Sequence, residues 1–204
     1  ADVRVNGQSI GTWDLKRSVA ELSQGLRRAA FVVPASALAG AAQAEIAIHY
    51  KSEANTAGWA VMEYAGGAFP LSAMGAIHAD SKVAPLRHAR NVVGHGMRVG
   101  EKDYTAGIGV HAKHFLEYPL NGQFTRFTAQ VGVDAVTKGK GTVVFEVYAD
   151  GKQVWTSTLM DGLAPAKSID LDVSKVNRLR LLVNDADDGE DYDAANWCNP
   201  QLHM

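Results

Sequence analysis

The chain has 204 residues, with 20 Lys and Arg against 22 Asp and Glu, a formal charge of −2 and a pI near 6.4. This balance provides no basic field for nucleic acid and no cationic cluster for a membrane surface, so neither partner is expected. No apolar run reaches the roughly 18 residues that a membrane helix needs, which argues against membrane insertion. A chain of this length can bury a sizeable core without disulfide bonds.

The sequence contains no recognisable catalytic constellation. It has no GxSxG elbow, SxxK motif or P-loop, and its single cysteine, Cys198, has no evident base partner. A glycosidase pair of carboxylates is identified by its separation in space, which a sequence does not give. We therefore expect no catalytic activity from this chain. A lone cysteine also rules out a disulfide framework, and it fits either the cytosol or an exported bacterial protein.

The first third of the chain predicts several strands and one short helix. The stretch VRVNGQSIG places the turn residues Asn6 and Gly7 between apolar pairs, and AAFVVPAS and AEIAIHY are typical of further strands. Between the first and second of these stretches, residues 14–28 carry Leu and Val at helical spacing. They end in basic residues that suit a helix C-terminus.

The regular pattern breaks at the glycine pair Gly66-Gly67, and we place a domain boundary there. Residues 1–66 are then a β-rich accessory segment and residues 67–204 a second domain. From residue 72 to residue 100 no clean period exists, which predicts a loop with one or two short strands.

Alternation with period two is the strongest signal in the second domain. In FTRFTAQVGVD, the apolar residues that share one face are Phe127, Ala129, Val131 and Val133. The same alternation recurs over residues 143–147, 169–173 and 179–183, and Asp150-Gly151 supplies the positive φ of a tight hairpin turn. Strands at this spacing predict an all-β fold, an antiparallel β-sandwich.

Two histidines three residues apart, His111 and His114, raise the question of a metal or catalytic site. If the segment is a strand, as the run from Phe115 to Tyr118 indicates, residues three apart point to opposite faces and cannot share one ion. No HExxH motif is present. We expect packed or rim histidines, with His114 facing solvent.

The run NDADDGEDYD, residues 184–193, places six carboxylates at the end of a predicted strand. It has two interpretations, a solvated loop or a site for Ca²⁺, a hard cation that prefers oxygen ligands. The loop does not match the EF-hand pattern, so a calcium site here would be irregular. Its candidate ligands are Asp185, Asp187, Asp188 and Asp191.

Aromatic side chains are the best candidates for ligand contacts. Tryptophan and tyrosine present flat apolar faces with polar tips, which is the chemistry that the C–H face of a sugar requires. Because most tryptophans of a sandwich lie in its core, only some of these rings are expected to face a ligand.

The stretches YTAGIGVHAKHFLEYPLNGQFTRFTAQVGVDA, GTVVFEVYADGKQVW and KSIDLDVSKVNRLRLLVNDADDGEDYDAANWCNPQL occur in a recognisable order. Together they resemble the NPCBM domain, a carbohydrate-binding module family also called CBM51. The resemblance covers roughly residues 72 to 202. It rests on the Tyr-x-x-Gly-Ile-Gly-x-His-Ala core, the Phe-x-Ala-x-Val-Gly-Val-Asp strand, the Asp-Gly hairpin and the final Asp-x-Ala-x-Trp.

The resemblance implies a jelly-roll β-sandwich that binds sugars, galactose-containing glycans in some members, and that accompanies a secreted glycoside hydrolase. It also implies a structural calcium ion. The matched motifs and the aromatic candidates together give our predicted ligand-binding residues, which are Tyr104, His111, Asp134, Trp155, Tyr192, Asp193 and Trp197. Two departures are visible: the tryptophan and serine expected ahead of the first motif are not clear, and Asn196 and Cys198 stand where small or acidic residues are expected.

Two functions compete on these grounds. The first is a non-catalytic carbohydrate-binding module that targets an exported carbohydrate-active enzyme to glycan, with galactose-type sugars favoured and a secreted or periplasmic location expected. The second is an accessory domain that contacts a catalytic domain or partner subunit without binding sugar. Residues 1–66 resemble part of another jelly-roll, which would need further strands to complete its sheet.

Overall fold

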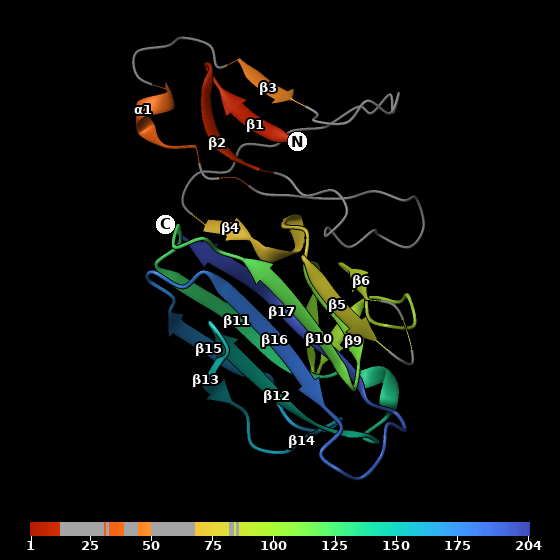
Figure 1. Cartoon of the computed structure of the whole chain (residues 1–204). Coiled ribbons are helices and arrows are strands. Elements are labelled where there is room, and N and C mark those ends of the chain that lie inside the picture. The colour runs from red at the N-terminus through yellow and green to blue at the C-terminus, as the bar shows by residue number, and fades with distance from the viewer. Residues whose placement is uncertain (13–30, 32, 39–44, 50–67, 82–83, 85) are drawn as a thin grey trace.

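The computed structural model describes residues 1–12, 31, 33–38, 45–49, 68–81, 84 and 86–204. Between residues 68 and 203 the strands form two antiparallel sheets that lie face to face, so the predicted all-β sandwich is confirmed (Figure 1). Among the described residues, no helix is long and apolar enough to cross a membrane.

The N-terminal residues form a separate three-stranded antiparallel sheet with the order β2-β1-β3. Its strands are β1 (Asp2–Val5), β2 (Gln8–Thr12) and β3 (Ile46–His49). Asn6 and Gly7 make the predicted turn, both with positive φ. The Asn6 side chain donates to the carbonyl of Ala37 and accepts from the N–H of Glu45, which ties the sheet to the segment beside it.

The strand predicted in AAFVVPAS is not found over its described residues, 31 and 33–36. In AAFVVPAS the chain enters α1 (Ala35–Leu38), because the carbonyl of Pro34 accepts a hydrogen bond from the N–H of Ala37 and turns the backbone. Proline has no N–H to donate to a strand partner, so a helix start suits it better. The helix predicted at residues 14–28 lies outside the described residues.

Sheet I of the sandwich has the order β13-β12-β16-β10-β5, with β14 paired to β12. Its strands are β5 (His78–Ser81), β10 (His114–Pro119), β12 (Thr142–Ala149), β13 (Lys152–Thr156), β14 (Met160–Asp161) and β16 (Arg178–Asn184). Asp150 and Gly151 join β12 to β13 with positive φ, as the sequence predicts.

Sheet II has the order β15-β11-β17-β9-β6, with β4 paired to β17. Its strands are β4 (Ala68–Pro70), β6 (Arg87–His88), β9 (Gly107–His111), β11 (Arg126–Val133), β15 (Lys167–Asp172) and β17 (Ala194–His203). Two 3₁₀ turns, η1 (Leu71–Ala73) and η2 (Ala135–Thr137), complete this part of the chain.

The core lies between the two sheets and is built from the alternating apolar residues of each strand. Phe127, Val131 and Val133 of β11 are fully buried, as their period-two spacing predicts. Across the sandwich, Phe145 of sheet I meets Trp197 of sheet II edge to face, with ring centroids 5.2 Å apart. Such aromatic pairs contribute about 0.5–1.5 kcal/mol beyond the area that they bury.

A small hairpin, β7 (Met97–Val99) and β8 (Lys102–Tyr104), and the loop before it cover the outer face of sheet II. Glycines make this close packing possible. A Cβ added at Gly132 would lie 2.2 Å from Val99, and one at Gly109 would lie 2.3 Å from the carbonyl oxygen of Arg90.

Replacing Gly109 by alanine is expected to lower the free energy of unfolding by about 1–3 kcal/mol, because the new methyl group meets backbone atoms of the covering loop. Gly96 is the matched control, because a Cβ there meets nothing within 4 Å and its φ is ordinary. Urea unfolding of Gly109→Ala, Gly96→Ala and the parent chain checks this. Equal midpoints for the two variants would contradict it.

Candidate functional site

The connections at one end of the sandwich, here called the loop end, bring together most of the polar residues singled out in the sequence. They are residues 112–113 between β9 and β10, residues 134–141 between β11 and β12, and residues 185–193 between β16 and β17. The strand register sets this arrangement, since His114 pairs with Val183 and His111 pairs with Ala194. These connections lie at the lower end of the sandwich in Figure 1.

A buried carboxylate, Asp134, organises this end of sheet II. Its Oδ1 accepts hydrogen bonds from Asn91 Nδ2 at 3.0 Å and from Val136 N at 2.9 Å. Its Oδ2 accepts from Asn196 Nδ2 at 2.6 Å and from Arg98 N at 3.1 Å. With 1% of its surface exposed and both oxygens engaged, Asp134 holds three segments in place and is not free to bind a ligand as predicted.

A second buried carboxylate, Asp193, lies under the acidic loop. Its Oδ1 accepts from Thr142 N at 3.0 Å, whereas its Oδ2 has no hydrogen-bond partner among the described residues. Burial raises the pKa of Asp193 to about 6. Its backbone carbonyl accepts from Ala112 N at 3.2 Å, which places the predicted residue His111 beside it.

Tyr192 is the exposed aromatic residue of the loop end. It has a positive φ of 68°, and 55% of its surface is accessible to solvent. Lys140 Nζ lies 4.6 Å from the centroid of its ring, a cation–π distance. Gly141 lets the backbone of Tyr192 pack closely against it, because a Cβ at position 141 would lie 2.3 Å from the carbonyl oxygen of Tyr192.

The four predicted calcium ligands do not converge in this structure. Asp185 is buried and pairs with Lys113 Nζ at 3.0 Å. Asp187, Asp188 and Asp191 are exposed, and Asp188 accepts from the Thr142 hydroxyl. In the part of the chain that the structure describes, no three His, Cys, Asp or Glu side chains form a group that could hold a metal ion. Calcium binding by these four carboxylates therefore stays a prediction.

The two predicted tryptophans lie away from the loop end. Trp197 is 1% exposed and packs against Phe145 in the core, so it cannot contact a ligand without unfolding. Trp155 lies on the edge strand β13 opposite the buried Val147 and packs against the same core. Both rings belong to the structural framework.

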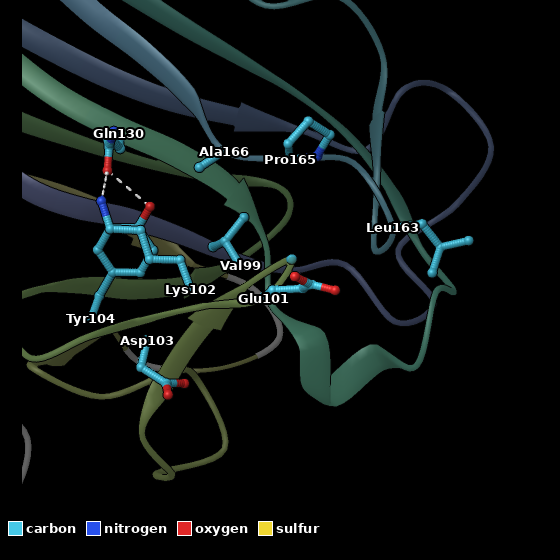
Figure 2. A pocket seen from close by; sticks show the side chains of 10 residues that line it. Val99, Glu101, Lys102, Asp103, Tyr104, Gln130, Leu163, Pro165 and Ala166 are labelled. Atoms are coloured by element: carbon cyan, nitrogen blue, oxygen red, sulfur yellow. Dashed lines mark hydrogen bonds between the residues drawn. The ribbon is translucent and has the colours of Figure 1, made fainter.

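Tyr104 lies on the outer face of sheet II, at the side of an open groove of about 860 Å³ (Figure 2). Its hydroxyl and Lys102 Nζ both donate to Gln130 Oε1, at 2.8 and 3.0 Å. The opposite side carries Leu163, 78% exposed. Because Tyr104 itself is only 5% exposed, the groove offers a ligand the lysine and glutamine groups more than the tyrosine ring.

The two histidines lie on different sheets. His111 ends β9 half-buried, with Nδ1 donating to the Ala112 carbonyl at 2.8 Å. His114 begins β10 and is 2% exposed, so the expectation that it faces solvent is wrong. It shares the parity of Leu116 and Tyr118 and therefore points into the core, where burial lowers its pKa to about 4.

Sequence reasoning missed Asn91, Lys140 and Gln130. Asn91 lies in a segment without periodicity, so no pattern marked it, although it donates to Asp134. Lys140 lies between two glycines, a local signal for a turn that presents a side chain. Gln130 is an outward residue of a predicted strand and is indistinguishable there from an ordinary surface position.

A two-sheet sandwich with polar loops gathered at one end is an architecture that carbohydrate-binding modules share with other β-sandwich proteins. The model of the NPCBM/NEW2 domain matches residues 67–203, and the chain belongs to this family.

Comparison with known proteins supports the association with carbohydrate-active enzymes. A putative endo-alpha-N-acetylgalactosaminidase of Renibacterium salmoninarum is 33% identical over 108 residues, which are 52% of this chain and 7% of that protein. The chain thus spans a small part of this curated relative.

Two solved structures of proteins from Clostridium perfringens share the fold. The CBM51 of GH95 in complex with methyl-galactose has a TM-score of 0.63 and 27% identity, covering 66% of this chain and 99% of that one. The CBM51-2 and INT domains of ZmpB in complex with GlcNAc give a TM-score of 0.64 and 27% identity, covering 67% and 31%. Together with the family, these relatives identify a carbohydrate-binding module of the kind found in glycoside hydrolases.

Asp193 and His114 are expected to give opposite pH dependences of stability. Because its pKa is raised, Asp193 contributes stability at pH values below its ordinary pKa of 3.8, and this stability is lost as the pH rises through about 6. Because its pKa is lowered, His114 contributes stability at pH values above its ordinary pKa of 6.5, and this stability is lost as the pH falls through about 4. Each amounts to at most about 3 kcal/mol, and the two largely cancel in the parent chain.

Substitution separates the two contributions. In Asp193→Asn the free energy of unfolding should rise between pH 4 and pH 6.5, and in His114→Gln it should fall over the same window. Urea unfolding at several pH values, with chelator present, measures both. Slopes of the same sign in the two variants would show that at least one of these groups is not buried as described.

Proposed function

We propose that residues 67–204 bind a galactose-type sugar at the loop end, with the ring of Tyr192 as the platform. The observation that carries the proposal is that Tyr192 has more than half of its surface exposed. It lies at the end of the acidic loop, directly before the Asp-x-Ala-x-Trp motif. Exposed aromatic rings with polar neighbours are how proteins bind ligands that have both an apolar face and hydroxyl groups.

The chemistry of galactose suits this arrangement. Its axial O4 leaves the hydrogens on C3, C4 and C5 together on one face of the ring, and that face can lie on the Tyr192 ring. Lys140 Nζ lies over one face of the Tyr192 ring, which leaves the other face for the sugar, and it can donate to a sugar hydroxyl. The exposed Asp188 of the same loop can accept from one. Hydrogen bonds to hydroxyls of defined orientation discriminate epimers more strongly than apolar contact does.

The comparisons support a galactose-type ligand without deciding it. The similar Clostridium module was solved with methyl-galactose, and the Renibacterium relative is named for a sugar of the same configuration at C4. The ZmpB module was solved with GlcNAc, whose O4 is equatorial. Both sugars therefore belong in the test.

In a full-length enzyme that contains it, the module would hold an exported carbohydrate-active catalytic domain on its glycan. A lasting position near the substrate raises the effective concentration of the catalytic domain at that surface, even when a single sugar contact is weak. Calcium binding by the acidic loop stays a prediction that calorimetric titration with CaCl₂ tests, and the sugar contacts above do not depend on it.

Tyr192→Ala is expected to weaken binding of methyl galactoside at least about fivefold, because an aromatic contact contributes about 1 kcal/mol beyond buried area. Tyr192→Phe keeps the ring and should bind within about twofold of the parent chain. Calorimetry or ligand-detected NMR measures both, with methyl galactoside and GlcNAc as ligands.

Thermal unfolding of each variant serves as the control, since an exposed side chain should change stability little. Equal affinity of the alanine and phenylalanine variants would show that the Tyr192 ring is not the sugar platform. If the folded parent chain binds neither sugar, the alternative stands: an accessory domain that contacts a catalytic domain or subunit.

A further inference from the structure

Two arginines at the edge of sheet II have exposed guanidinium groups directed to the same glycine. Arg87 Nε donates to the carbonyl of Val92 at 2.9 Å, and Arg90 Nη1 donates to the carbonyl of Gly94 at 3.1 Å. The guanidinium carbon of Arg87 lies 3.7 Å from the position that a Cβ would take at Gly94. Because Gly94 has no side chain, the guanidinium group of Arg87 stays open on that side.

Neither guanidinium group is neutralised by a carboxylate among the described residues. Other arginines of the sandwich are paired with carboxylates. Arg98 lies 3.4 Å from Asp103, and Arg126 makes a bidentate contact with Asp170 at 2.5–2.6 Å. Arg87 and Arg90 have only backbone carbonyls as partners, and each uses a single N–H for them. The remaining N–H donors are therefore available to an anion.

The loop that carries the pair is held in place by a buried side chain. Asn91 Oδ1 accepts from His95 N at 2.9 Å, and Asn91 Nδ2 donates to Asp134 and to the carbonyl of Gly96. Asn91 is 1% exposed, so these bonds are shielded from water. A loop fixed in this way loses little conformational entropy when a ligand binds.

The loop that carries the pair is hydrogen-bonded to the loop end, since Asn91, next to Arg90, donates to Asp134. The backbone of Arg90 packs on the outer face of Gly109, and His111 follows two residues later on the same strand and face. His111 is in turn beside Asp193, the neighbour of Tyr192. A glycan longer than one sugar could therefore contact the Tyr192 ring and reach toward the arginines.

We propose that Arg87 and Arg90 bind an acidic group of the glycan, a sulfate ester or a carboxylate, so that the ligands of this module are acidic galactosides. Arginine donates two parallel hydrogen bonds to either group, which gives both affinity and orientation. The chain carries a net charge of −2, so the pair does not belong to a chain-wide basic field of the kind that binds nucleic acid. The inference rests on the proposed sugar function for the neutral part of the ligand.

Calorimetry compares four probes: a neutral galactoside disaccharide, its sulfated form, its sialylated form, and inorganic sulfate. At low salt the better acidic form should bind about tenfold or more tightly than the neutral form, as expected for charge-assisted hydrogen bonds. The gain should shrink in 0.5 M NaCl. The sulfated and sialylated arms tell a sulfate ester from a carboxylate, and inorganic sulfate reports an anion bound without sugar.

The double variant Arg87→Gln/Arg90→Gln should bind the acidic and neutral disaccharides equally, with an unchanged affinity for the neutral one. Arg126→Gln, an exposed arginine at the opposite end of sheet II, is the matched control and should keep both the gain and the neutral affinity. If the double variant unfolds, Arg90→Lys retains the charge without the planar fork and should lose most of the gain.

The possible outcomes separate the two proposals. Equal binding of neutral and acidic forms, or a gain that survives in the double variant, overturns the acidic-ligand inference and leaves the sugar function standing. Failure of every galactoside while inorganic sulfate binds the parent chain, and not the double variant, overturns the sugar function and retains the anion site.

Discussion

The loop end depends on one buried carboxylate, that of Asp134. Four N–H donors from three separate segments converge on its two oxygens, and these bonds are what align the loop before β7, the turn after β11 and strand β17. A buried carboxylate without such donors would be costly, since each unpaired polar group costs about 1–3 kcal/mol and a charge costs more. The network is therefore stabilising only when all three segments are in place, which makes these three segments a cooperative unit.

Burial at this end affects function through the residues that remain exposed. Asp134 and Asn91 are buried and fully engaged, and they fix a short loop whose arginines point outward. On the other side Gly141 lets the backbone of Tyr192 pack closely, so a tyrosine with positive φ presents its ring to solvent. The rigid polar interior thus pre-orients the exposed groups, which lowers the entropy cost of binding any ligand at this surface.

The sequence predicts the sandwich well and the placement of individual polar side chains poorly, for a physical reason. Period-two alternation follows from burial of one strand face, so the core residues Phe127 and Phe145 could be found from the pattern alone. His114 was misplaced although the same alternation puts it on the face of Leu116 and Tyr118, which is the buried face of β10. Asn91 and the arginines beside it belong to a loop whose shape comes from long-range hydrogen bonds, and no local pattern encodes those.

The two departures from the family pattern fit the same packing. Asn196 donates to Asp134 Oδ2 at 2.6 Å; an aspartate there would set two carboxylates against each other, and one of them would have to take up a proton. Cys198 lies on the outer face of β17, fully buried beneath Met97, Val99 and Tyr104, where burial raises the pKa of its thiol to about 12. Both positions lie under the hairpin and its loop and not in the exposed surface around Tyr192. The departures therefore affect how the covering segments pack on sheet II.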